Sequence, residues 1–346
     1  MANELTQGIS RQADACAGLG APFSTGILRA AACDAESGGI TAQLLSPWAG
    51  ATADEMMGDA MGLRLLASLH HLVLAGSAPD LAACYPPLAF APDAAWDAAH
   101  AALADHQAQV AAMLTHEPQT NEVRRSACLL GGFLTIAKES GLPLRCFELG
   151  ASAGLNSLWD KFSYDIGGEL WGDPDSSVAL SCAWDGNPPA LDSKLTVTER
   201  QACDRKVLDM RRADDRLRLQ SYCWAEQGER MTRLRAAIAL AQDVPVQVEE
   251  RQAAQWIGRA GPRAGAATVV FHSIVWQYIP AIEQQAIQAT MLDHARQATV
   301  QAPFFWLRME IDEDRRQFEL RLWEGMTGAD RLLAIVHPHG ECARWL

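Results

Sequence analysis

The residues best suited to chemistry are a carboxylate and the turn of small residues that follows it. The apolar run Leu142–Leu149 predicts a strand with Glu148 near its end, and small residues fill the turn from Gly150 to Gly154. The glycines permit a sharp bend and a close approach of the next helix, which we expect to begin near Leu155. The first N–H groups of that helix would face an anion or a carboxylate, and Glu148 would accept a hydrogen bond from an amino group.

The spacing of this turn resembles the first motif of class I S-adenosylmethionine-dependent methyltransferases. That motif is written Glu-x-Gly-x-Gly-x-Gly. This chain has Glu148, Gly150, Ser152 and Gly154 at the four positions, so a serine replaces the middle glycine. The resemblance implies a transferase with S-adenosylmethionine as its cofactor and a small or medium-sized molecule as the methyl acceptor.

Two other interpretations of the turn remain open. Residues 150–154 also match the GxSxG nucleophile elbow of serine hydrolases of the α/β type, with His337 or His339 downstream to complete a triad. An elbow follows several strands of its sheet, whereas the chain before Ser152 predicts helices and contains no HGG-type oxyanion segment. The acid at Glu148 has no role in a hydrolase. The remaining alternative is a tight turn in a protein of the same fold that binds a ligand without catalysis.

The predicted secondary structure around the turn differs between the two parts of the chain. Residues 1–140 are rich in alanine and predict helices over 53–76, 95–115 and about 122–140. From residue 141 onward, short apolar runs alternate with helical patterns, which is typical of a doubly wound α/β sheet. We therefore expect an N-terminal all-α lid or substrate domain, residues 1–140, and a Rossmann-like domain with a mostly parallel sheet, residues 141–346.

The second domain should contain seven strands. They are expected at Leu142–Leu149, Leu195–Glu199, Val244–Val248, Ala267–His272, Pro303–Ile311, Phe318–Trp323 and Leu332–His337. No helical pattern separates the last two, so they should pair antiparallel at the edge of the sheet, as they do in class I methyltransferases. Residues 160–193 interrupt the alternation and predict a hairpin insertion.

The composition limits the classes of partner. The 346 residues are 49% hydrophobic and 21% charged, as in ordinary globular proteins, and the formal net charge is −13. Such a charge repels phosphate, so we expect neither double-stranded nucleic acid nor a membrane as a partner. Nine cysteines without a CxxC pair indicate reduced thiols in a cytoplasmic protein, and no signal peptide or membrane-spanning run is recognisable.

Several segments resemble a bacterial protein family known as domain of unknown function 2332. The shared segments are Gln119–Val123 with Arg125, Glu148–Asn156, Thr198–Asp204, Phe271–Ser273, and His337–Gly340 with Trp345 near the end of the chain. They occur in this order over nearly the whole chain. The family resemblance supports the architecture and implies no particular reaction.

The methyltransferase resemblance assigns cofactor-binding roles to individual residues. Those expected around the methionine part of the cofactor are Glu148, Gly150, Ser152, Gly154 and Asn156. Glu199, at the end of the second predicted strand, would bind both ribose hydroxyls, because a carboxylate can accept twice. A solvated acid without this role is the alternative for Glu199. Gln252 lies where the pattern has an acid beside the adenine amino group.

The loop after the fourth predicted strand would face the transferred methyl group. It contains His272 and Tyr278 as candidate catalytic residues and Trp276 as a candidate substrate-binding residue. The loop lacks the Asn/Asp-Pro-Pro-Tyr/Phe motif of enzymes that methylate base amino groups. That class of acceptor is therefore disfavoured.

Two further pairs of residues are candidates for the site. Asn121 and Glu122 would contact the cofactor or the acceptor as part of a lid, or would cap the following helix. His337 or His339 would serve as a general base, because an imidazole titrates near neutrality. Structural histidines at a strand end are the alternative. We expect no metal site.

Overall fold

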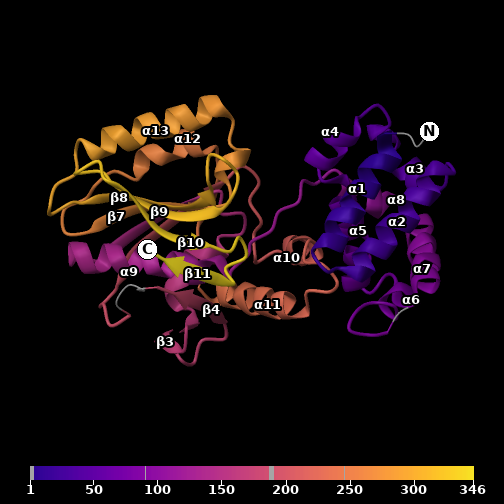
Figure 1. The fold of residues 1–346 in the computed structure, drawn as a ribbon, viewed down its shortest axis with the longest axis horizontal. Helices are drawn as coiled ribbons and strands as arrows, with labels where there is room; N and C mark the ends of the chain where they lie inside the picture. Colours follow the sequence, from indigo (N-terminus) through magenta and orange to yellow (C-terminus); the bar gives the residue numbers. More distant parts are fainter. Residues whose placement is uncertain (1–3, 90, 187–190, 245) are drawn as a thin grey trace. The chain divides into compact units, whose positions relative to one another are not determined.

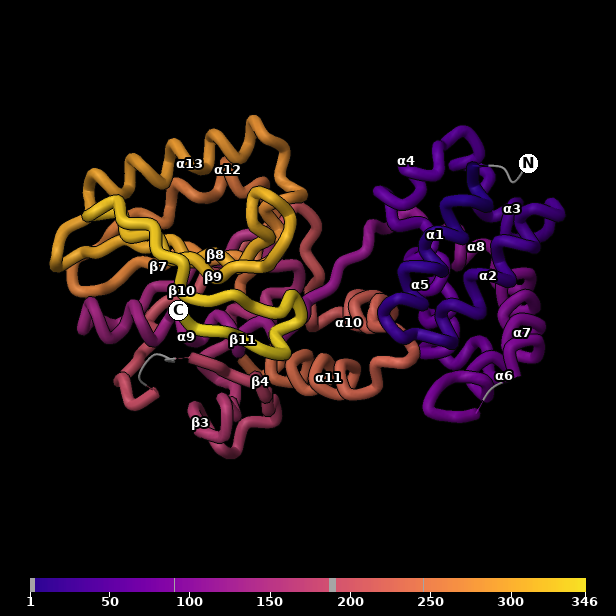
Figure 2. The backbone as a smooth tube through the Cα atoms, viewed as in Figure 1, coloured from indigo at the N-terminus to yellow at the C-terminus, as the bar shows by residue number. Residues whose placement is uncertain are grey.

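The structure is a computed structural model that describes residues 4–89, 91–186, 191–244 and 246–346. The chain divides into two compact units, which can be followed in Figure 1 and Figure 2. One unit consists of Met1–Thr120 and Arg211–Thr232, and the other consists of Asn121–Met210 and Arg233–Leu346. Each unit is described by itself.

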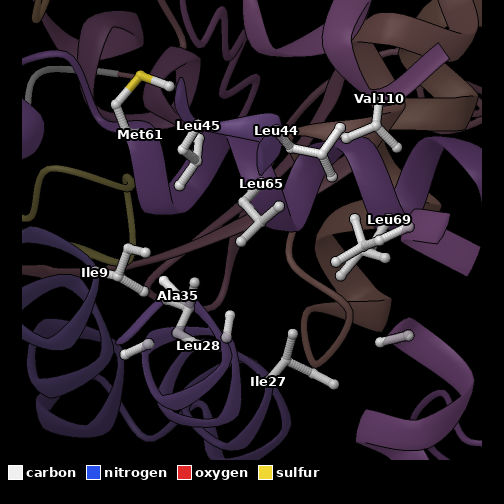
Figure 3. Close-up of a cluster of buried hydrophobic side chains, with 14 of the residues drawn as sticks. Ile9, Ile27, Leu28, Ala35, Leu44, Leu45, Met61, Leu65, Leu69 and Val110 are labelled. Carbon is white, nitrogen blue, oxygen red and sulfur yellow. The ribbon is translucent and has the colours of Figure 1, made fainter. Parts of the chain in front are cut away.

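The described residues of the first unit form helices and no strand. Its α-helices are α1 (Glu4–Gly18), α2 (Pro22–Glu36), α3 (Ile40–Leu44), α4 (Ala53–Gly58), α5 (Met61–Leu74), α6 (Pro79–Ala82), α7 (Pro92–Asp105), α8 (Gln107–Leu114), α10 (Ala213–Ser221) and the beginning of α11 (Gly228–Asp243). The apolar faces of α1 to α8 form one core, in which Ile9, Leu28 and Leu65 are completely buried (Figure 3). Burial of these faces is the main source of stability for such a bundle.

Two of the helices predicted in this unit are each divided in two. The predicted helix 53–76 is α4 followed by α5, because Ala60 adopts a left-handed conformation with φ 54° between them. The predicted helix 95–115 is α7 followed by α8, which are separated at His106, where the backbone leaves the helical region. Helical spacing of apolar residues continues across both breaks, so it did not reveal them.

In the second unit, eleven strands within the described residues form one sheet. They are β1 (Leu144–Leu149), β2 (Ser163–Ile166), β3 (Glu169–Gly172), β4 (Ala179–Asp185), β5 (Val197–Asp204), β6 (Val248–Glu250), β7 (Ala267–Ser273), β8 (Phe304–Ile311), β9 (Phe318–Glu324), β10 (Asp330–Val336) and β11 (Cys342–Trp345). Their spatial order is β3-β2-β4-β11-β10-β9-β8-β7-β1-β5-β6.

The sheet is mixed, which corrects the prediction of a mostly parallel sheet. The neighbours β6, β5, β1, β7 and β8 run parallel to one another, whereas β8, β9, β10 and β11 form an antiparallel meander. Residues 312–317 between β8 and β9 are too few for the crossover that a parallel connection needs. The strands β9 and β10 pair antiparallel as predicted, but they lie inside the sheet because β11 and β4 extend it beyond them.

Residues 160–193 contain β2, β3 and β4, and residues 187–190 of this predicted insertion lie outside the described residues. The hairpin β2–β3 forms as predicted, and β4 joins it to the main sheet by pairing parallel with β11. The predicted strand Val244–Val248 begins only at Val248, as β6, and its residue 245 is likewise not described. The insertion therefore extends the sheet.

Helices cover both faces of this sheet (Figure 1). Helix α9 (Arg125–Ser140) contacts β4, β7, β8 and β9, while α12 (Ala253–Trp256) and α13 (Ala281–Ala295) pack together on the opposite face. The predicted domain boundary at residue 140 thus differs from the observed units, because residues 121–140 belong with the sheet and 211–232 belong with the helices. No helix in the described ranges has the length and apolar character that crossing a membrane requires.

Candidate functional site

The candidate site lies at the carboxyl ends of β1, β5 and β7. Glu148, near the end of β1, is paired in register with Ala202 of β5 and Phe271 of β7, so it lies between two parallel neighbours. The order of the strands along the chain reverses between β1 and β7. In doubly wound sheets, ligands bind outside the carboxyl ends of the strands at such a reversal.

Glu148 is a buried carboxyl group, with 3% of its surface exposed. Burial raises its pKa to about 8, and a hydrogen bond donated by the hydroxyl of Ser157 offsets only part of this effect. The carboxyl is therefore mostly protonated at neutral pH. A cation placed beside it would favour the charged form and release the proton.

The turn after β1 has the conformation that its small residues predict. Gly150 and Gly154 have φ values of 65° and 75°, which favour glycine. A Cβ at Gly150 would lie 2.2 Å from Cγ2 of Val275, and one at Gly154 would lie 2.7 Å from Cγ2 of Val248. Each glycine therefore makes room for a valine of a neighbouring segment.

Four backbone N–H groups of this turn have partners within the protein, so the expectation of free donors facing a ligand is wrong for these four. Ser152 N–H donates to Asp204 Oδ2 at 2.7 Å, and Leu155 N–H donates to Asn121 Oδ1 at 3.0 Å. The N–H groups of Ala151 and Gly154 donate to backbone carbonyls. The conformation is fixed by side chains from other segments, which local sequence does not reveal.

The helix expected near Leu155 is a short 3₁₀-helix, η2 (Leu155–Lys161), instead of an α-helix. The side chains of its first turn bond to neighbouring segments: Asn156 Oδ1 accepts from Ser126 Oγ, and Ser157 donates to Glu148. Side chains of this kind compete with regular helix formation. The chain then enters β2 directly.

Ser152 has the strained backbone but not the partner of a catalytic serine. Its φ is 54°, and the side chain is buried, with its Oγ lacking a hydrogen-bond partner among the described residues. The hydrogen bond from nucleophile to base that a triad needs is therefore not formed in this conformation.

The acid at the carboxyl end of β5 is Asp204, and not Glu199 as predicted. That strand continues to Asp204, whereas Glu199 lies near its start, opposite Arg145, to which it is paired at 2.6 Å. The hydrogen bond from Arg145 lowers the pKa of Glu199. Glu199 is consequently not brought to the turn, because the strand is longer than its apolar residues indicate.

Asp204 was not among the residues predicted for the site. Its two carboxylate oxygens accept separately, from Ser152 N–H and from Lys206 N–H. Burial raises its pKa, and these two donors act in the opposite direction. The position of Asp204 directly after the buried residues Ala202 and Cys203 was the signal in the sequence that would have identified it.

The residues before α9 contact the same turn. Asn121 accepts from Leu155, and Asn156 Nδ2 donates to the carbonyl of Glu122 at 3.3 Å. Asn121, Glu122 and Asn156 are all buried. These three predicted site residues are thus brought together, where they hold the segment before α9 against the turn after β1.

The loop between β10 and β11 contains His337 and His339, the two histidines considered as general bases. His339 Nδ1 lies 3.8 Å from Glu122 Oε2, and His339 N–H donates to His337 Nδ1 at 3.3 Å. A Cβ at Gly340 would lie 2.2 Å from the carbonyl oxygen of Arg124, so this loop packs closely on the start of α9. His339 therefore lies beside Glu122, at the edge of the candidate site.

His272, at the end of β7, is completely buried and forms a pair with Glu310 of β8. Its Nδ1 lies 2.6 Å from Glu310 Oε1, and its ring stacks on Trp276 with a centroid distance of 5.4 Å. Among the described residues, Nε2 of His272 has no hydrogen-bond partner. Glu310 was not among the residues that the sequence predicted for the site.

The remaining two predicted residues lie at the surface. Tyr278 is 65% exposed, at the end of the 3₁₀-helix η4 (Trp276–Tyr278). Gln252 is exposed at the start of α12, next to Arg251, whose N–H donates to the carbonyl of Asp204 at 2.9 Å. Over the described ranges, no three His, Cys, Asp or Glu side chains converge as metal ligands.

Comparisons with known proteins identify the family. The model of DUF2332, described as "Uncharacterized protein conserved in bacteria", matches residues 6–345, so the chain belongs to this family. Neither the curated proteins nor the solved structures gave a match.

Proposed function

We propose that this DUF2332 protein is an S-adenosylmethionine-dependent methyltransferase that acts on a small or medium-sized acceptor. The observation that carries the proposal is the parallel order β6-β5-β1-β7-β8, with Glu148 and Gly150 at the point of reversal between β1 and β7. This is the strand order, third-second-first-fourth-fifth, of nucleotide-binding doubly wound sheets. A Rossmann-like fold of the methyltransferase type is part of the proposal.

The side chains at this edge suit the cofactor. Glu148 would bind the ammonium group of the methionine part, because a nearby cation stabilises its charged form. Asp204 would bind the ribose hydroxyls, since each of its oxygens retains accepting capacity beyond the backbone donor it already has. Gln252, near the end of β5, would lie on the adenine side. When bound, the cofactor supplies an electrophilic methyl group.

The space above the turn suits the cofactor only after Val275 moves. Its Cγ2 occupies the position that a Cβ at Gly150 would approach, and the N–H groups of Ser152 and Leu155 are bonded within the protein. Binding would therefore use side chains more than the backbone amides and would require displacement of the segment that contains Val275.

Calorimetric titration of the purified protein with S-adenosylmethionine and S-adenosylhomocysteine tests the proposal. Glu148 is mostly protonated at pH 7, so ammonium binding should release up to about one proton, seen as a difference in enthalpy between phosphate and Tris buffers. Glu148→Gln should abolish this release and weaken binding about tenfold or more. Absence of binding by the unaltered protein would overturn the proposal.

A serine hydrolase is the second candidate, and the conformation of Ser152 favours it. A serine with positive φ and an unpartnered hydroxyl, in the turn that follows a strand, resembles the strained turn of a nucleophile elbow. Labelling by a fluorophosphonate probe that disappears in Ser152→Ala would establish this function. Lack of labelling in the unaltered protein would eliminate it.

A further inference from the structure

Residues 274–278, which we call the cover segment, contact two parts of the candidate site at once. Val275 packs on Gly150, and Trp276 stacks on the ring of His272 with an interplanar angle of 15°. Gly150 is the turn residue of the proposed cofactor site, and His272 lies at the end of the next strand. A single short segment therefore covers both.

One carboxylate oxygen holds the cover segment in place. Glu310 Oε1 accepts from Val275 N–H at 3.0 Å and from Trp276 N–H at 3.3 Å, and the same oxygen lies 2.6 Å from His272 Nδ1. Ile274, where the segment begins, has φ 52°. A β-branched residue in this conformation is a true outlier, and such strain persists where surrounding contacts enforce it.

The histidine beneath the cover segment is arranged to accept a proton. A carboxylate next to Nδ1 keeps the proton on that nitrogen, so Nε2 carries the lone pair. Nε2 is buried without a hydrogen-bond partner among the described residues, and the neighbouring rings are those of Trp276 and Trp306. A buried polar atom without a partner requires an explanation beyond packing.

We propose that Nε2 of His272 is the proton acceptor of the site, that Glu310 is its positioning residue, and that displacement of the cover segment opens His272 and Gly150 together. The proton of an O–H or N–H group on the acceptor passes to Nε2, and the electron pair of that bond stays on the oxygen or nitrogen. The carboxylate of Glu310 balances the charge of the resulting imidazolium. The assignment to methyl transfer rests on the proposed function.

Reaction with diethyl pyrocarbonate, followed by peptide mass spectrometry, measures directly how accessible His272 is to a reagent in solution. The reagent ethoxycarbonylates an unprotonated imidazole nitrogen that it can reach. We expect slow labelling of His272 in the unaltered protein and labelling about tenfold faster or more in Trp276→Ala, because local opening controls access. Glu310→Gln should also accelerate it, since a neutral oxygen holds the two N–H groups less strongly.

The chain provides matched controls for this experiment. His294 is also buried in the second unit, with Nε2 3.2 Å from the carbonyl of Ile257 and Nδ1 without a hydrogen-bond partner in the described structure. His337 is partly exposed and should react at the same rate in all variants. Equal acceleration at His294 and His272 would indicate general loosening and would overturn the proposal. No acceleration at His272 in Trp276→Ala would also overturn it.

Nitrogen NMR of the His272 ring shows which of its two nitrogens carries the proton. This position tests the role of Glu310 as a positioning residue, whereas a purely structural role would not fix it. In the neutral imidazole of His272, Nδ1 should carry the proton; a proton on Nε2 in place of Nδ1 would refute the assignment. Both measurements are made on protein without added S-adenosylmethionine. A protein that shows selective labelling of His272 but binds no S-adenosylmethionine would keep this inference and lose the proposed function.

Discussion

A methyl group of Val275 lies where a side chain on Gly150 would have to begin. The separation from an added Cβ would be 2.2 Å, far shorter than any contact between non-bonded carbon atoms, and Gly150 also has φ 65°. Glycine at this position is therefore required twice, by the backbone and by the loop after β7. The turn after β1 and the loop after β7, which lie where the strand order reverses, are therefore in direct contact.

Replacement of Gly150 by alanine should lower the free energy of unfolding by about 2–4 kcal/mol, because strain from positive φ adds to overlap with Val275. Gly141→Ala is the matched control, since Gly141 has φ 63° and nothing within 4 Å of an added Cβ. It should cost only about 1 kcal/mol. Chemical denaturation of both variants measures the difference.

The double variant Gly150→Ala/Val275→Ala isolates the contact. Removal of the two Cγ atoms should restore part of the lost stability, whereas Cβ of Val275, 2.9 Å from the added atom, prevents full recovery. If the changes in the free energy of unfolding caused by the two single substitutions simply add up in the double variant, Val275 does not restrict residue 150.

The stability of the protein should depend on pH through Glu148. Its pKa is about 8 in the folded protein, above the ordinary 4.5, so between these values the folded state holds a proton that the unfolded state has lost. Stability from this group is therefore fully present below about pH 4.5 and is lost as pH rises through 8.

Glu148→Gln should remove this dependence, because the amide resembles the neutral carboxyl. At pH 8.5 the variant should be more stable than the unaltered protein by about 3–5 kcal/mol, and at pH 5 the two should be similar. Denaturation with urea at a series of pH values measures this. A variant that is destabilised equally at all pH values would contradict the raised pKa.

Asp204 and Glu199 should respond differently to loss of charge. Asp204→Asn should weaken binding of S-adenosylhomocysteine about tenfold or more, because this acid ends β5 beside the turn. Glu199→Gln should leave binding unchanged and should lower stability by about 1–3 kcal/mol, since Arg145 is buried and loses its charged partner. Calorimetric titration and denaturation of both variants separate the two effects. The reverse pattern would restore Glu199 as the ribose ligand.

The thiols should differ sharply in reactivity. Cys33 and Cys342 are exposed and should react quickly with Ellman's reagent in the native protein. Cys146 and Cys203 should react only after unfolding, because burial raises the pKa of both thiols. All nine cysteines should be counted in denaturant. Fewer than nine would reveal a disulfide in the purified protein.

The sequence by itself determined the features that depend on local pattern. Alternation of apolar runs and helical spacing located the strands β1, β7, β8, β9 and β10, and small residues between Gly150 and Gly154 required a tight turn. The acid at Glu148 was identifiable for the same reason, because its position relative to the strand and the turn is a matter of spacing along the chain.

Only the tertiary structure decided which groups meet. The ends of β5 and β8 brought Asp204 to Ser152 and Glu310 to His272 across 52 and 38 positions of sequence, and no local pattern encodes such contacts. The strands β2, β3, β4 and β11 extend the sheet beyond β10, and the pairing of β4 with β11 that joins them to it is a contact that no local pattern encodes. Burial by distant segments, which also sets the pKa of Glu148, is a property of the folded chain and not of its sequence pattern.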